Sequence, residues 1–394
     1  MTLVIVNLVV AQQKSPISPS TLTKRMFGWH HMDFPDVVSN YHWESISDLS
    51  WLGYLVDPLT GNPKDQNNAE KVANWSIDPA VLAAKNHNVR INLCVGFEPS
   101  SGIPTFISNP NPSARSNLRE KIIAAVVAAN ADGVNINFEN EAIFTTDDNL
   151  QRFHSFIEEV ENGIGPNREL SITLIPSWCT LSNFTTFINL LNDNIDLFIL
   201  MGYNYHWPSN INCGPVAPLY SFNGENLSVS YHINKFLNSG IAANTFLLGI
   251  PYFGINWPTV QPTDCSNIMS GTAPGENFDY WYYKSNTSGY FNTLYRDPNT
   301  FDPFFCYPDA STVWHKAFID DVESYQKKYD LVKQRGIAGI AVWRLGQDDG
   351  YDDLWNLINI NLSSNNIEQP FGTIYDMGGP NGDYHTSEEY YFTI

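Results

Sequence analysis

The stretch ADGVNINFEN, residues 131–140, has the alternating pattern of a β-strand and ends in a carboxylate. Because successive side chains of a strand point to opposite faces, one face is apolar and the other carries Asn135, Asn137 and Glu139. Buried amides are costly unless they are hydrogen-bonded. The polar row therefore indicates either a structural hydrogen-bond ladder or a site at which the Glu139 carboxyl group transfers a proton.

The elements that must position this row repeat along the chain. Short apolar or aromatic runs alternate with helix-like stretches, a pattern typical of parallel β/α units. Eight such runs occur, at residues 25–31, 49–57, 89–97, 132–139, 170–178, 196–205, 245–253 and 337–343. They predict an α/β fold, a closed (β/α)8 TIM barrel. The alternative, an open doubly wound sheet, would need a glycine-rich turn after its first strand, and GWHHMDFPD supplies none.

A barrel gives the polar row a direction. Its polar face points toward the barrel axis, and Glu139 falls at the C-terminal end of its strand, where barrel enzymes carry their active sites. The apolar set Val134, Ile136 and Phe138 is expected to pack beneath the surrounding helices. Asp132 is out of phase with the inward row, so we expect it to brace the start of the strand.

The connection after the seventh run, from about 258 to 324, is much longer than the usual link and is rich in Tyr, Trp, Asn and Pro. Long connections in compact domains are usually functional. Because the loops that follow barrel strands form the active face, this insertion is predicted to wall a binding cleft.

The polar row resembles the catalytic signature of glycoside hydrolase family 18, the chitinase and chitobiase group, written Asp-x-x-Asp-x-Asp-x-Glu. Asp132 and Glu139 match its ends, and amides replace its two middle acids. Three further segments are similar to family motifs and occur in barrel order. They are LMGYNYHW with Met201, Tyr203 and Asn204, GIPYFGINW, and GIAGIAVWRLGQDD with Trp343. The resemblance covers residues 24–361 approximately and implies the same barrel.

The resemblance also implies a mechanism in which the 2-acetamido group of the substrate is the nucleophile. Glu139 would be the general acid and then the base, Asn137 would orient the acetamido group, and Tyr203 would hydrogen-bond its carbonyl. Trp343 would form the apolar floor under the sugar. Further substrate contacts are expected from Asn135, Met201 and Asn204. Neither a metal nor a cofactor is implied.

The amide at Asn137 departs from the family pattern. It can hydrogen-bond an acetamido group, but it has no negative charge to stabilise a developing cation. Three functions therefore remain open. The first is a glycosidase acting on β-linked N-acetylglucosamine in chitin oligomers, N-glycan cores or peptidoglycan. The second is a catalytically weak, lectin-like protein that binds these sugars. The third is a barrel hydrolase with no acetamido requirement.

The amino-acid composition limits the classes of molecule that the protein is expected to bind. The formal net charge is −20, and aromatic residues make up 14% of the chain. This balance argues against nucleic acid and anionic membrane surfaces. It favours a hydroxyl-rich ligand whose faces stack on aromatic rings.

Both ends of the chain carry separate expectations. Residues 1–12 have the length and apolarity of an export signal, too short to span a bilayer, which predicts a secreted protein; the alternative is a buried first strand. Residues 24–362 form the predicted barrel. Residues 363–394 read as a linker and a β-rich tail, which resembles the start of a CUB-like module or else packs on the barrel.

Of the five cysteines, Cys213, Cys265 and Cys306 lie in long connections and are candidates for disulfides.

Overall fold

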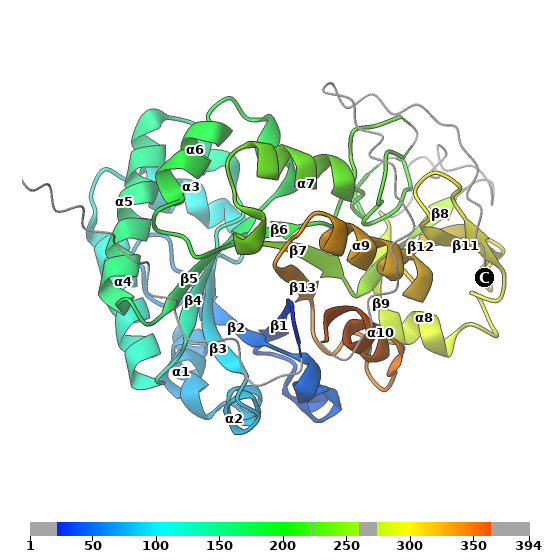
Figure 1. The fold of residues 1–394 in the computed structure, drawn as a ribbon, viewed down its shortest axis with the longest axis horizontal. Coiled ribbons are helices and arrows are strands. Elements are labelled where there is room, and N and C mark those ends of the chain that lie inside the picture. Colours follow the sequence, from blue (N-terminus) through cyan, green and yellow to red (C-terminus); the bar gives the residue numbers. More distant parts are fainter. Residues whose placement is uncertain (1–21, 211, 223, 260–273, 364–394) are drawn as a thin grey trace, which may run out of the picture.

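Eight parallel strands close into a barrel in the computed structural model, which describes residues 22–363 except 211, 223 and 260–273. The order around the barrel is β1-β13-β7-β6-β5-β4-β3-β2 (Figure 1). The strands are β1 Arg25–His31, β2 Asp48–Leu55, β3 Arg90–Gly96, β4 Gly133–Asn137, β5 Glu169–Leu174, β6 Leu197–Met201, β7 Phe246–Pro251 and β13 Gly339–Trp343. The predicted (β/α)8 barrel is confirmed, and β1 pairs with β13 to close it.

Six of the eight predicted runs extend past the C-terminal end of the observed strand, and three of these are 170–178, 196–205 and 245–253. Within the run 170–178, β5 ends at Leu174 and a 3-10 helix begins at Pro176. Proline has no N–H and cannot donate a hydrogen bond to the neighbouring strand. Within the run 196–205, β6 ends at Met201, and Asn204 adopts a left-handed backbone conformation with φ 59°. The run 245–253 is divided, because β7 ends at Pro251 and β8 begins at Phe253.

Helices cover the outside of the barrel (Figure 1). They are α1 Gln66–Asn74, α2 Pro79–Asn86, α3 Ile103–Ser108, α4 Ser113–Ala128, α5 Asp147–Ile164, α6 Phe184–Leu191, α7 Val229–Asn238, α9 Val322–Gln334 and α10 Asp353–Leu362. The outward face of β4 packs on this layer as its sequence pattern predicts. The ring of Phe138, one residue beyond β4, lies 5.9 Å from the rings of Phe106 in α3 and Phe156 in α5.

Charged residues from four strands meet at the N-terminal ends of the barrel strands. Arg25 donates to Glu169 with Nη1 at 2.7 Å and to Asp48 with Nε at 3.1 Å, and Arg90 approaches the same two carboxylates. Asp48 and Glu169 are buried. This end of the barrel is therefore closed by paired charges, and the opposite end carries the site.

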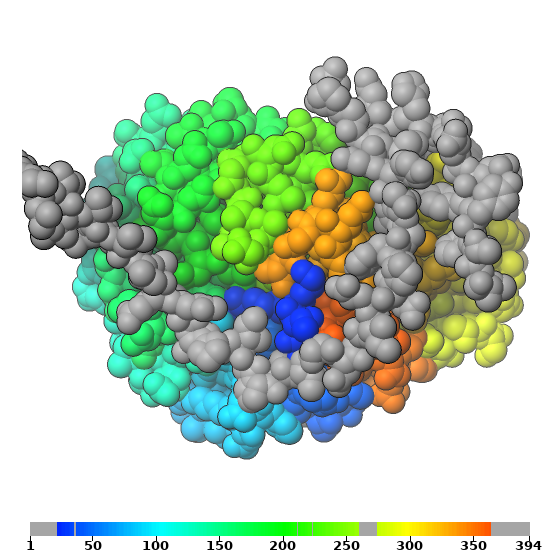
Figure 2. Space-filling model, in the orientation of Figure 1, coloured from blue at the N-terminus to red at the C-terminus, as the bar shows by residue number. Residues whose placement is uncertain are grey.

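The insertion between β7 and α9 forms an antiparallel sheet of order β10-β11-β12-β8-β9. Its elements are β8 Phe253–Thr259, β9 Glu276–Asp279, α8 Tyr280–Ser285, β10 Leu294–Arg296, β11 Pro303–Pro308 and β12 Trp314–Phe318. In the space-filling view the yellow part of this insertion lies at one end of the molecule (Figure 2). The long insertion predicted after the seventh strand is thus a sheet of its own.

Some sequence predictions lie outside the described residues. They concern the export signal at 1–12, nearly all of the tail at 363–394, and Cys265. Within the described part of the chain, every helix is too short or too polar to span a bilayer.

Candidate active site

Asn135 lies inside the barrel and uses both ends of its amide. Its Oδ1 accepts from Trp29 Nε1 at 2.9 Å and from Cys94 Sγ at 3.3 Å, and its Nδ2 donates to Ser171 Oγ at 3.0 Å and to Thr173 Oγ1 at 3.5 Å. These partners come from β1, β3 and β5. The network satisfies a buried amide and fixes its orientation. Asn135 is therefore a support beneath the site.

Asn137 and Glu139 interact directly at the C-terminal end of β4. The Asn137 Nδ2 donates to Glu139 Oε1 at 2.9 Å. The Asn137 Oδ1 is buried and has no hydrogen-bond partner among the described residues. Gly96 of β3 lies beside Asn137, and a Cβ added to Gly96 would lie 3.1 Å from the backbone carbonyl oxygen of Asn137. An unsatisfied buried acceptor next to a partly exposed acid is suited to a donor from a ligand.

Glu139 is partly exposed, whereas Asn137 beside it is buried. Burial raises its pKa above the ordinary value, and the hydrogen bond from Asn137 lowers it by a smaller amount. Burial acts in this direction because a low-dielectric surrounding disfavours the charged form. A carboxyl group with a raised pKa keeps its proton at higher pH, as a general acid requires.

Tyr203 lies beyond the end of β6 and faces the same region. Burial raises its pKa far above the ordinary range, and the charge of Glu139 adds to this effect, so the phenol is a neutral donor. Gly249 of β7 leaves room for its ring, since a Cβ there would lie 3.2 Å from Tyr203 Cε1. Met201 is buried at the end of β6, and Asn204 is partly exposed. Neither forms a hydrogen bond with Glu139 in the described part of the chain.

Trp343 ends β13 and is partly exposed. Its ring meets that of Trp29 in an edge-to-face contact with centroids 5.9 Å apart. Since Trp29 also donates to Asn135, a continuous set of contacts joins Trp343 to the polar row of β4. Sequence reasoning missed Trp29 and Cys94. Their inward positions in the runs 25–31 and 89–97 were the available signal, but a single Trp or Cys in a strand is usually core.

Asp132 has the bracing position expected of it. One carboxylate oxygen accepts from the backbone N–H of Ile91 at 2.9 Å, next to the start of β4.

Comparison with known proteins gives the family of the chain. Residues 57–348 match the profile of the family described as Glycosyl hydrolases family 18. The chain belongs to this family.

Family 18 relatives are distant in sequence. The chain is 26% identical over 201 residues to chitotriosidase-1 of Mus musculus, a match that covers 50% of this chain and 43% of that protein. It is 23% identical over 376 residues to a chitinase-like effector of Moniliophthora roreri, covering 83% and 89%. The chain thus spans less than half of the mouse relative. The barrel is similar to the class V chitinase of Nicotiana tobaccum, solved in complex with NAG4, with TM-score 0.69, 16% identity, and coverage of 85% and 97%.

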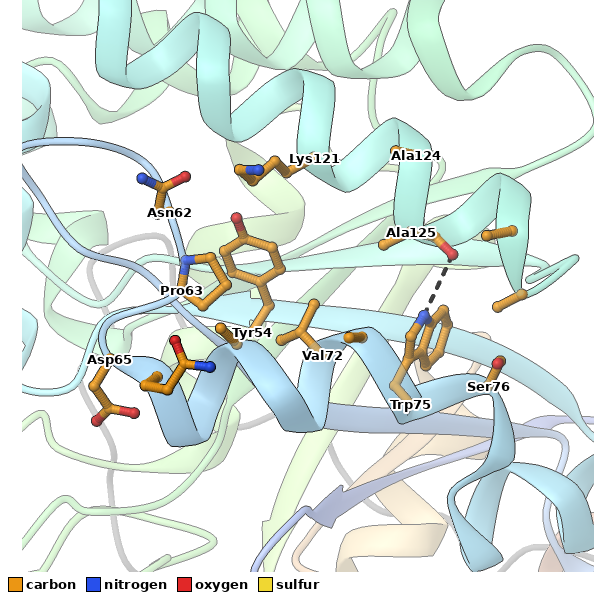
Figure 3. A pocket seen from close by; sticks show the side chains of 15 residues that line it. Tyr54, Asn62, Pro63, Asp65, Val72, Trp75, Ser76, Lys121, Ala124 and Ala125 are labelled. Carbon is orange, nitrogen blue, oxygen red and sulfur yellow. Dashed lines mark hydrogen bonds between the residues drawn. The ribbon is translucent and has the colours of Figure 1, made fainter.

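A cavity of about 580 Å³ lies elsewhere, on the outside of this family 18 barrel between α1 and α4 (Figure 3). Tyr54 and Trp75 line it together with several alanines, and Trp75 Nε1 donates to the Ala125 carbonyl at 3.3 Å. None of the site residues lines it. We assign the active site from the arrangement of Glu139, Asn137, Tyr203 and Trp343, because an acid of raised pKa lies there beside an amide and a neutral phenol. The outer cavity is lined mainly by apolar side chains. No cluster of three or more metal-ligating side chains occurs in the described part of the chain.

Proposed function

We propose that this chain is a secreted glycoside hydrolase that cleaves β-linked N-acetylglucosamine glycans by substrate-assisted, retaining catalysis. The observation that carries the proposal is the pairing of Glu139 with Asn137. It combines a partly exposed acid of raised pKa with a buried amide oxygen, two residues away, that has no partner among the described residues.

Glu139 donates its proton to the glycosidic oxygen as the bond from the anomeric carbon to that oxygen breaks. The carbonyl oxygen of the 2-acetamido group attacks the anomeric carbon and forms an oxazolinium ion. Water then attacks the same carbon, its proton passes to Glu139, and the acetamido group is released. Two displacements at one carbon retain its configuration.

The neighbouring residues position the nucleophile. The free Oδ1 of Asn137 accepts the acetamido N–H, and the neutral Tyr203 hydroxyl donates to the acetamido carbonyl. These contacts hold the carbonyl oxygen within attack distance, which lowers the entropic part of the barrier. Trp343 supports the sugar ring from below.

Hydrolysis of chito-oligosaccharides tests the proposal. The Glu139→Gln variant keeps the shape of the site without a transferable proton, so turnover of an unactivated oligosaccharide should fall by about 10²-fold or more while binding persists. The first product should retain its anomeric configuration in early NMR spectra, and a thiazoline analogue of the intermediate should inhibit tightly. An inverted product, or turnover by Glu139→Gln close to that of the wild type, would refute the mechanism.

One observation favours a lectin-like alternative. Asn137 offers a dipole where a carboxylate would stabilise the oxazolinium cation, so a binding protein with little turnover is the second candidate. Retention on chitin beads without hydrolysis of chito-oligosaccharides would select it.

A further inference from the structure

Arg344 follows Trp343 directly at the end of β13. Its guanidinium carbon lies 3.7 Å from the ring centroid of Phe34, which precedes the 3-10 helix Pro35–Asn40 in the connection after β1. Because β1 and β13 are paired neighbours in the barrel, this contact lies at the same rim as the Trp343 platform.

The charge of Arg344 is poorly neutralised. Its nearest carboxylate oxygen is Asp279 Oδ2, 4.0 Å from Nη2, and the other oxygen of Asp279 already accepts from Gln347 Nε2 at 2.7 Å. Among the described residues, no group accepts a hydrogen bond from the guanidinium. Only 14% of the side chain is exposed. Arginine has five N–H donors and stays protonated, so this group is a partly dehydrated cation with donors to spare.

The titratable groups around Arg344 do not change this balance. Burial lowers the pKa of His30 to about 4 and lowers the pKa of His31, and Arg344 adds to both effects, so both imidazoles are neutral at pH 7. Burial holds the pKa of Tyr41 far above its ordinary value. Within the described part of the chain, Asp279 is the carboxylate whose charge acts on Arg344. In a chain whose net charge is −20, Arg344 is therefore a cation whose nearest carboxylate lies beyond hydrogen-bond distance.

We propose that Arg344 binds a carboxylate carried by the amino sugar that lies on or next to Trp343. The substrate class is then a β-linked N-acetylglucosamine glycan whose sugars bear carboxylate ether substituents. This inference rests on the proposed function, since it places a sugar on Trp343. A bidentate guanidinium–carboxylate pair is short, directional and strong when it is shielded from water.

The overall negative charge does not oppose such a substrate at this point. Charges separated by more than about 8 Å are largely screened at physiological ionic strength. Interactions within the cleft therefore decide binding, and Arg344 is the cation next to the platform.

Two chitin ethers of similar size provide the test. Carboxymethyl-chitin carries the anion, and glycol chitin carries a neutral hydroxyethyl group in its place. We expect the wild type to have the higher kcat/KM on carboxymethyl-chitin. In Arg344→Gln the ratio of the two kcat/KM values should fall by about tenfold or more, and Arg344→Lys should restore part of it because the charge returns without the planar fork.

Lys64→Gln is the matched control. Lys64 is a cation of the β2–α1 connection that already has a carboxylate partner, Glu98, at 2.9 Å. Its loss should leave the ratio within about twofold, since an exposed, paired charge contributes little. If Arg344 only braces the Phe34 connection, both substrates will suffer equally in Arg344→Gln and the ratio will not move, which overturns the proposal.

A binding measurement separates this proposal from the proposed function. Calorimetry measures the affinity for carboxymethyl-chitin oligomers of the Glu139→Gln variant and of the Glu139→Gln, Arg344→Gln double variant, in the absence of turnover. A wild type that hydrolyses neither polymer, together with about tenfold weaker binding in the double variant, would refute the hydrolase and support the carboxylate site. Equal affinity of the two variants, with unchanged melting temperatures, would reject the site.

Discussion

The side-chain amide of Asn137 donates a 2.9 Å hydrogen bond to Oε1 of Glu139. This bond stabilises the charged form of Glu139, whereas burial, the larger effect, stabilises the protonated form. No neighbouring carboxylate contributes to the raised pKa of Glu139. The acid is thus tuned by desolvation and one amide, in place of repulsion between acids.

Asn137→Asp should introduce that repulsion. A carboxylate at hydrogen-bond distance raises the pKa of Glu139 further, because the pair shares one proton. The alkaline limb of kcat/KM, which follows loss of the Glu139 proton, should move to higher pH by roughly one unit or more, with faster turnover near neutrality.

The new carboxylate at position 137 needs a hydrogen-bond donor, and Asn135 cannot supply it. Both donor contacts of Asn135 go to Ser171 and Thr173, so Asn135 has no hydrogen left for a new carboxylate. The support must come from the Glu139 hydroxyl. Full pH profiles of both proteins on one chito-oligosaccharide decide the matter. A lower rate at every pH in a folded variant would mean that the pocket is fitted to the amide.

Glu139→Gln should stabilise the fold at neutral pH. The pKa of Glu139 is higher in the folded chain than in the unfolded chain, so stability is lost as pH rises from the unfolded value, about 4.3, through the folded value. The glutamine cannot ionise and avoids this loss. We expect a higher melting temperature than the wild type at pH 7 and similar melting temperatures near pH 3.5. Equal melting temperatures at both pH values would contradict the raised pKa.

Asp348 should limit stability in the same direction. Burial raises its pKa from 3.8 to about 7, and its Oδ2 is buried without a partner among the described residues. Stability should therefore fall between pH 4 and pH 7 as the unfolded chain loses this proton first. Asp348→Asn should raise the free energy of unfolding at pH 8 by roughly 1–3 kcal/mol, and change it little at pH 4. The exposed neighbour Asp349 contributes to the raised pKa of Asp348 less than burial does, so Asp349→Asn should have a smaller effect at pH 8 than Asp348→Asn.

Arg25→Met should be strongly destabilising. Removing this guanidinium leaves Arg90 as the remaining cation beside the buried carboxylates of Asp48 and Glu169, with Ser47 as a neutral donor to Asp48, so urea unfolding should show a loss of about 3–5 kcal/mol. Arg119→Ala breaks the surface pair with Glu159 and should cost about 1 kcal/mol or less. Similar losses in the two variants would show that the charges at the closed end of the barrel do not depend on Arg25.

The sequence alone determined the barrel and the location of its acid. Eight apolar runs with intervening amphipathic helices specify parallel strands, and the period of two in β4 directs Asn135, Asn137 and Glu139 inward, because side-chain direction along a strand is a local property. Strand ends were less well determined. β5 ends shortly before Pro176 and β6 shortly before the left-handed Asn204, although the apolar runs continue past both strand ends.

Tertiary structure decided how the site is tuned. Asn135 is satisfied by Trp29, 106 residues away in the chain, and Arg344 lies over Phe34 because closure of the barrel places the first strand beside the last. Burial and partners of this kind depend on side chains that the sequence separates widely. The raised pKa of Glu139, the unpartnered oxygen of Asn137 and the poorly neutralised charge of Arg344 therefore exist only in the closed barrel, where water is excluded and distant strands meet.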